Sequence, residues 1–124
     1  MAIEFVYNNQ HNIVTTQIRG ALALDEIEFF MENLINSKDI PSDTNILWDI
    51  RSMEFGNIDF EFENHVVAFF KKIIDARGAG RSAIVSDYTL GEPLVKMLII
   101  LMKDVSENLN SFKTIEEAEL WLIS

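Results

Sequence analysis

The stretch TNILWDIRSMEFGNIDFEFENHVVAFF, from Thr44 to Phe70, decides the fold. It begins with an apolar run that ends in Asp49 and Arg51, and it continues through a short polar loop. Beyond the loop, apolar residues recur at the spacing of one helical face. These residues are Phe62, Val66, Phe69 and Ile73. The stretch therefore predicts a buried strand followed by an amphipathic helix, which is the repeating unit of α/β proteins.

Acidic residues occupy the first turns of this predicted helix. Asp59, Glu61 and Glu63 lie where negative charge favours the positive end of the helix dipole. They lack the alternating Asp and Gly pattern of a calcium-binding loop. We therefore expect all three to lie on a solvated face.

On the amino-terminal side, two short segments alternate apolar and polar residues, as strands do. They are IEFVY at 3–7 and NIVTTQIRG at 12–20, and the turn formers between them favour an antiparallel hairpin. A helix then follows, whose apolar face consists of Ile27, Phe30, Met31, Leu34 and Ile35.

On the carboxyl-terminal side, strand and helix patterns alternate twice more. RSAIVS and NLNSFK read as short strands, and EPLVKMLIILMKDV between them reads as a helix with Pro93 at its first position. The final helix has Thr114 and, three residues later, Glu117, which is the spacing of a capping box.

The resulting order is β-β-α-β-α-β-α-β-α. It predicts an α/β fold with a mainly parallel sheet of about five strands, an antiparallel first strand and four helices. With 124 residues, the chain suits one domain spanning residues 1–124. Because the second strand is only half apolar, we expect one face of the sheet to be partly covered.

Charge and composition narrow the classes of partner. Twenty acidic and ten basic residues leave a net charge of -10, which disfavours binding to nucleic acid. There is no cysteine, so thiolate chemistry and disulfides are excluded. The first residues show no signal peptide, and we expect a cytoplasmic protein.

Several segments together resemble the SpoIIAA-like proteins, a branch of the STAS group typified by bacterial anti-sigma factor antagonists. The matching segments are IRGALALDEI, ILWDIR, SAIVSD and FKTIEEAELWL. The resemblance implies a non-enzymatic, regulatory binding module. In the anti-sigma antagonists, a serine at the start of the helix after the central strand is phosphorylated. Here the equivalent segment GNIDFEF has Phe60 and Glu61 at the expected hydroxyl positions, so the usual phosphorylatable serine is missing.

Polar residues follow two of the predicted parallel strands. In open α/β sheets, ligands bind beyond the carboxyl ends of such strands. The candidate ligand-binding residues are Asp49, Arg51, Ser52, Asp87 and Tyr88, with Ser86 beside them. The alternative interpretation is purely structural, with Asp49 and Arg51 forming a local ion pair and Asp87 beginning a turn.

The two histidines offer little support for catalysis or metal binding. His65 lies at the border of the apolar face of its helix, and Glu61 is its single local partner for acid–base chemistry. His11 lies in the predicted hairpin turn, and no spacing typical of paired zinc ligands occurs. We therefore expect no metal and no cofactor.

The segment LVKMLIILM is apolar on nearly every side of a helix. Lys96 and Lys103 share one narrow polar row, with Ile99 and Ile100 on opposite sides of it. The segment is far shorter than the roughly 20 residues that span a bilayer. It is compatible with a core helix, with a homodimer interface that includes Ile99, Ile100 and Lys103, or with a site for an apolar ligand.

These patterns favour a non-catalytic STAS-like module that acts by binding itself, a protein partner or a small apolar molecule. The alternative is a small enzyme that uses Asp49, Asp87 or His65 in the crevice at the strand ends. The absence of a paired nucleophile and base in the sequence favours the binding module.

Overall fold

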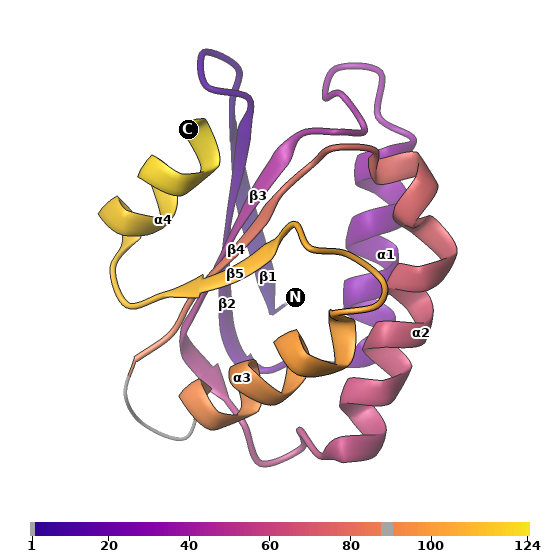
Figure 1. The fold of residues 1–124 in the computed structure, drawn as a ribbon, viewed down its shortest axis with the longest axis vertical. Coiled ribbons are helices and arrows are strands. Elements are labelled where there is room, and N and C mark those ends of the chain that lie inside the picture. Colours follow the sequence, from indigo (N-terminus) through magenta and orange to yellow (C-terminus); the bar gives the residue numbers. More distant parts are fainter. Residues whose placement is uncertain (1, 88–90) are drawn as a thin grey trace.

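The computed structural model describes residues 2–87 and 91–124 and shows five strands and four helices in that part of the chain (Figure 1). Their order confirms the predicted fold class. The strands are β1 (Ile3–Asn8), β2 (Ile13–Ala21), β3 (Asn45–Glu54), β4 (Ser82–Val85) and β5 (Leu109–Phe112). The helices are α1 (Leu24–Ile35), α2 (Phe60–Arg77), α3 (Gly91–Met102) and α4 (Ile115–Ile123).

The five strands form one sheet in the order β1-β2-β3-β4-β5. β1 pairs antiparallel with β2, and every later pair is parallel. Right-handed crossovers that always step to the next strand in the same direction place their helices on one face. Accordingly α1, α2 and α3 cover one face of the sheet, and α4 packs on the other (Figure 1).

The two faces have separate apolar cores because side chains alternate along each strand. Ile46, Trp48 and Ile50 of β3 face the three helices, whereas Leu47 faces α4. α4 covers the sheet through Ala118 and Leu122, which pack mainly on β3 and β4. On the sheet face that α4 covers, Val6 of β1 lies beyond the helix and is 72% exposed. This face is therefore only partly covered, as expected.

Three element ends differ from the prediction. β3 continues to Glu54, past the apolar run, because its pairing with β2 shifts register between Gln17 and Arg19 and then resumes at Ser52. α3 begins at Gly91, so Pro93 is its third residue and not its first. α3 ends at Met102, three residues before the end of the predicted helix.

The ends of α2 are determined by local chemistry. The Asp59 carboxylate accepts a hydrogen bond from the Phe62 amide at 2.8 Å, which satisfies one free N–H of the first turn. At the other end, Gly78 has φ of 53°, a left-handed conformation that favours glycine and stops the helix.

The cap of α4 forms only in part as predicted. The Thr114 hydroxyl oxygen accepts from the Glu117 amide at 3.2 Å, but Glu117 turns its carboxylate to the Thr114 hydroxyl and not to the Thr114 amide. One of the two bonds of a capping box is therefore replaced by a side-chain contact.

We expect Thr114→Ala to lower the free energy of unfolding by about 1 kcal/mol, because it removes this cap. Urea denaturation monitored by circular dichroism measures the change. Thr15→Ala makes the same substitution in β2, away from the α4 cap, and serves as the control. An unchanged midpoint for Thr114→Ala would show that the cap contributes nothing.

Candidate functional site

Asp49 and Arg51, which were predicted to follow the strand but lie within β3, form a closed ion pair. Arg51 Nε donates to Asp49 Oδ1, and Arg51 Nη2 donates to Asp49 Oδ2, both at 2.9 Å. These bonds lower the pKa of Asp49 and raise that of Arg51. The local ion pair of the alternative interpretation is therefore present, and each residue already satisfies the other's charge.

The remaining strand-end candidates lie around this pair. Ser52 is exposed, and the negative charges of Glu116 and Asp87 act on Arg51, which places Asp87 near the same edge. Ser86 is buried at the end of β4. Tyr88 lies outside the described residues. The structure thus gathers most of the predicted group at one edge, and its binding of a ligand stays a prediction.

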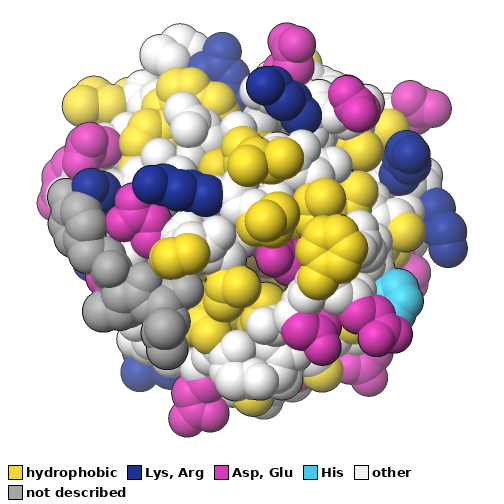
Figure 2. All heavy atoms as spheres, turned by 60° about the horizontal axis from the view of Figure 1, so that its bottom comes forward, with side chains coloured by type: hydrophobic (Ala, Val, Ile, Leu, Met, Phe, Trp, Pro, Cys, Tyr) yellow, Lys and Arg dark blue, Asp and Glu magenta, His cyan; other side chains and the backbone are white. Residues whose placement is uncertain are grey.

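A larger site lies on the opposite face of the sheet, between β3, α2 and α3. It is a cavity of about 150 Å³ that is open to the surface, and its lining is mostly aliphatic and aromatic. Hydrophobic side chains gather around a hollow on this side of the molecule (Figure 2). The sheet contributes Ile18, Trp48, Ile50 and Ile84, α2 contributes Phe62, Val66 and Phe70, and α3 contributes Leu94, Val95 and Leu98.

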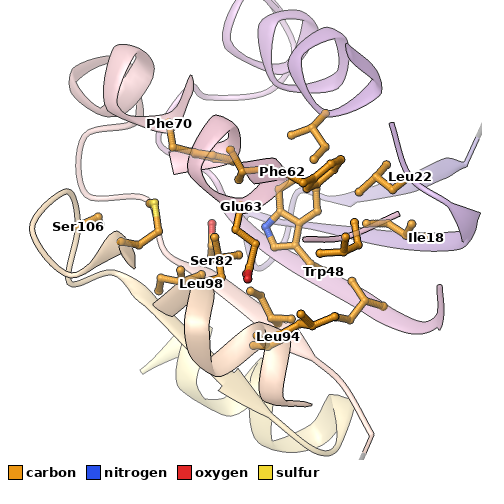
Figure 3. Close-up of a pocket in the computed structure, with 18 of the residues that line it drawn as sticks. Ile18, Leu22, Trp48, Phe62, Glu63, Phe70, Ser82, Leu94, Leu98 and Ser106 are labelled. Carbon is orange, nitrogen blue, oxygen red and sulfur yellow. The ribbon is translucent and has the colours of Figure 1, made fainter. Parts of the chain in front are cut away.

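One acidic side chain enters this apolar cavity. Glu63 of α2 is 4% exposed, and Figure 3 shows it directed into the pocket among Trp48, Leu94 and Leu98. Within residues 2–87 and 91–124, its carboxyl group has no hydrogen bond or ion pair. Burial raises the pKa of Glu63, because a charged carboxylate loses its hydration there.

A basic side chain also lines the cavity. Arg77, the last residue of α2, is 4% exposed, and its Nη1 donates to the carbonyls of Ser42 at 2.8 Å and Thr44 at 2.6 Å. Its Nη2 is buried without a partner among the described residues. Burial lowers the pKa of Arg77 to about 10.

Gly80 is required where the chain passes this guanidinium. A Cβ atom at Gly80 would lie 2.8 Å from Nη2 of Arg77 and 2.9 Å from its Nη1. Because Nη1 is held by two carbonyls, the guanidinium cannot simply move aside. The end of α2, the loop before β3 and the start of β4 are therefore packed around one side chain.

A solved structure resembles the fold of this chain over nearly its whole length. It is the crystal structure of an uncharacterized protein of the DUF3478 family from Shewanella loihica PV-4, described as having a SpoIIAA-like fold. The similarity covers 98% of this chain and 92% of that chain, with a TM-score of 0.65 and 15% sequence identity. This chain has a SpoIIAA-like fold. No protein-family profile matches it, and no curated protein does either.

Within this SpoIIAA-like fold, the position of Glu63 differs from the prediction. Glu63 was expected on a solvated face with Asp59 and Glu61, but it lies in the cavity, whereas the other two are exposed. The signal was present in the spacing, because Glu63 precedes Val66 by three positions and Phe70 by seven. The same face of α2 ends in Arg77, fourteen positions after Glu63.

The histidines of this SpoIIAA-like fold lie away from the cavity. His65 is exposed on α2 and does not line the pocket, and His11 is exposed in the hairpin. In the described ranges, no three His, Asp or Glu side chains come together as a metal site would require. None of the described helices is long and apolar enough to cross a membrane.

The apolar helix of the SpoIIAA-like fold, α3, is neither fully buried nor fully exposed. Val95 and Met102 are buried, and Leu98 lines the cavity. On the other side of the helix, Met97 is 41% exposed and Ile100 is 65% exposed. The interpretation of α3 as a deeply packed core helix is therefore wrong for this outer row.

The predicted α3 interface is also only partly exposed. Ile99 is half-buried and packs against the main core, whereas Ile100 and Lys103 are exposed. Ile99 and Ile100, which the sequence places on opposite sides of the lysine row, thus differ in burial.

Proposed function

We propose that this protein is a non-catalytic binding module that holds a small apolar ligand in the cavity between β3, α2 and α3. The observation that carries the proposal is the cavity itself, which is open to the surface and lined mostly by apolar side chains. Protein interiors are normally close-packed, so an apolar space of this size loses contacts that a ligand would restore. An apolar cavity of about 150 Å³ accommodates a molecule the size of benzene.

The binding role is better supported than the enzymatic alternative. That alternative relied on Asp49, Asp87 or His65 in the strand-end crevice. Asp49 is held in its pair with Arg51, and His65 is exposed and outside the cavity. Glu63 has no hydrogen-bonding partner in the described chain that would orient it as a general base.

Toluene binding tests the proposal, because toluene is apolar and close to the cavity in size. We expect saturable shifts of amide signals from α2 and α3 in two-dimensional NMR spectra. Leu98→Trp, which fills the cavity, should abolish them. Leu120→Trp adds the same ring at a position of α4 that is 67% exposed, and it should leave them unchanged. Shifts that persist in folded Leu98→Trp, or no saturable shifts in the wild type, would contradict the proposal.

We also propose that the protein forms a homodimer through the outer row of α3, which includes Met97 and Ile100, together with Lys103 directly after the helix. The support is the exposure of two large apolar side chains side by side on one helix. Removing this area from water is favourable by about 25 cal/mol per Å². The net charge of -10 opposes association, and salt screens that repulsion.

Sedimentation equilibrium should therefore show a dimer at tens of micromolar protein, with tighter association at higher salt. Ile100→Lys should shift the equilibrium to monomer, because it places a charge in the interface. Leu120→Lys makes the same change on α4 and should leave the dimer intact. A wild-type monomer at both low and moderate salt would rule out this interface.

A further inference from the structure

The cavity contains a carboxyl group for which the described part of the protein supplies no partner. We propose that the natural ligand is a small apolar amine, whose protonated amino group pairs with Glu63 while its apolar body packs against Trp48, Leu94 and Leu98. This inference rests on the proposed function and specifies the chemical class of its ligand.

Glu63 is isolated from the cations of the described part of the protein. Arg77 is the sole basic residue among the described residues that line the cavity. It lies fourteen positions further along α2, which separates the two backbone positions by about 21 Å along the helix axis at 1.5 Å per residue. Its guanidinium is bound to the Ser42 and Thr44 carbonyls. A counter-charge for an ionised Glu63 would therefore come from a molecule that enters the cavity.

Glu63 carries a carboxyl group that is largely removed from water and has no partner in the described part of the chain. Removing a carboxylate from water is unfavourable unless it is paired or stays neutral. At a position surrounded by Trp48, Leu94 and Leu98, an apolar side chain would pack without this cost (Figure 3). A site that binds a cation gives the carboxyl group a role that an apolar residue cannot fill.

The walls of the cavity also favour a cation. Four of the described residues that line it are aromatic: Trp48, Phe55, Phe62 and Phe70. The faces of aromatic rings attract cations, and tryptophan does so most strongly. The net charge of -10 also raises the local concentration of cations relative to anions. An anionic ligand of the same size would meet both this charge and Glu63.

Among the described residues that line the cavity, Glu63 is the one acid and Arg77 the one base. On α3, Glu92 and Lys96 pair with each other at 3.1 Å, and on α2 the Asp59 carboxylate caps the helix. On β3, Asp49 pairs with Arg51. Because burial raises the pKa of Glu63, amine binding should strengthen as pH rises and the carboxyl group loses its proton.

Isothermal titration calorimetry with three compounds of one shape tests the inference. 2-Phenylethylamine, 2-phenylethanol and 3-phenylpropionate share a phenyl body and differ in the polar group. We expect the amine to bind about tenfold tighter than the alcohol, and the carboxylate to bind most weakly. A wild-type protein that binds the alcohol or the carboxylate as tightly as the amine would overturn the inference.

Two matched variants locate the effect. Glu63→Gln should weaken amine binding about tenfold or more, with little change for the alcohol, because it removes the buried charge but keeps the shape. Glu61→Gln removes the same charge from an exposed position of the same helix and should change neither affinity. Equal effects of the two substitutions on amine binding would overturn the role of Glu63.

The two proposals fail in distinguishable ways. If toluene binds but the protein does not prefer the amine to the alcohol and the carboxylate, the cavity binds ligands and the assignment of an amine is wrong. If neither toluene nor any of the three phenyl compounds binds, both the proposed function and this inference are wrong.

Discussion

Arg77→Met is expected to lower the free energy of unfolding by about 2–3 kcal/mol. Arg77 is buried, and its Nη1 holds the carbonyls of Ser42 and Thr44 to the end of α2. Methionine has a similar length and keeps the packing, but it has no hydrogen-bond donor. The loop that leads into β3 would lose both of its bonds to α2.

Urea denaturation of the wild type and the variant at neutral pH measures this effect. Lys72→Met is the matched control, because it removes a cation from an exposed position of the same helix, and it should change stability by less than about 0.5 kcal/mol. Burial lowers the pKa of Arg77 to about 10, so its charge is itself costly to bury. Equal midpoints for Arg77→Met and the wild type would mean that this cost cancels the two hydrogen bonds.

Glu63→Leu is expected to act in the opposite direction and to raise the free energy of unfolding by about 1–3 kcal/mol at neutral pH. Glu63 is 4% exposed in an apolar cavity and has no partner in the described chain. Leucine removes the buried carboxyl group and packs against Trp48 and Leu98. The same substitution should remove the preference for an amine, which is the trade-off expected where stability is given up for binding.

The pH dependence of stability supplies a second test of Glu63→Leu. Burial raises the pKa of Glu63 in the folded state above its ordinary value, so the folded protein binds this proton more tightly than the unfolded chain. Proton binding to Glu63 therefore stabilises the folded wild type fully at pH values below the ordinary pKa of glutamate. This stabilisation is lost as pH rises through the raised pKa.

The difference between Glu63→Leu and the wild type should accordingly be smallest in acid and largest at neutral pH. Glu61→Leu, at an exposed position on the same helix, should show no comparable change with pH. Urea midpoints of the three proteins across this pH range measure both effects. A difference between Glu63→Leu and the wild type that does not vary with pH would show that Glu63 does not titrate in a buried environment.

The order of elements could be predicted from the sequence, because it depends on spacings within single segments. The alternation in 3–7 and 12–20 predicted the hairpin of β1 and β2, and the period of apolar residues predicted each helix. The pair of Asp49 and Arg51 was also predictable, since residues two apart in a strand point to the same side. The Thr114 cap depends on a three-residue spacing in the same way.

The candidate site was only partly predictable, and Glu61 and Glu63 show why. Both acids lie in the first turns of α2, and within the local sequence only the spacing of Glu63 to Val66 and Phe70 distinguishes them. Only the placement of α3 beside α2 buries Glu63 and leaves Glu61 in water. A cavity is likewise a space that helices from distant segments fail to fill, and no spacing within one helix encodes it.

The sequence by itself determined the β-β-α-β-α-β-α-β-α order, the antiparallel first strand and the cap residue of α4, because hydrogen bonding and periodicity act over a few neighbouring residues. Tertiary structure alone decided that Glu63 and Arg77 are buried, that Ile100 is exposed while Ile99 is half-buried, and that a cavity remains against β3. These features depend on contacts between residues that are far apart along the chain. Their burial is set by which helices meet across the sheet and by how closely they pack.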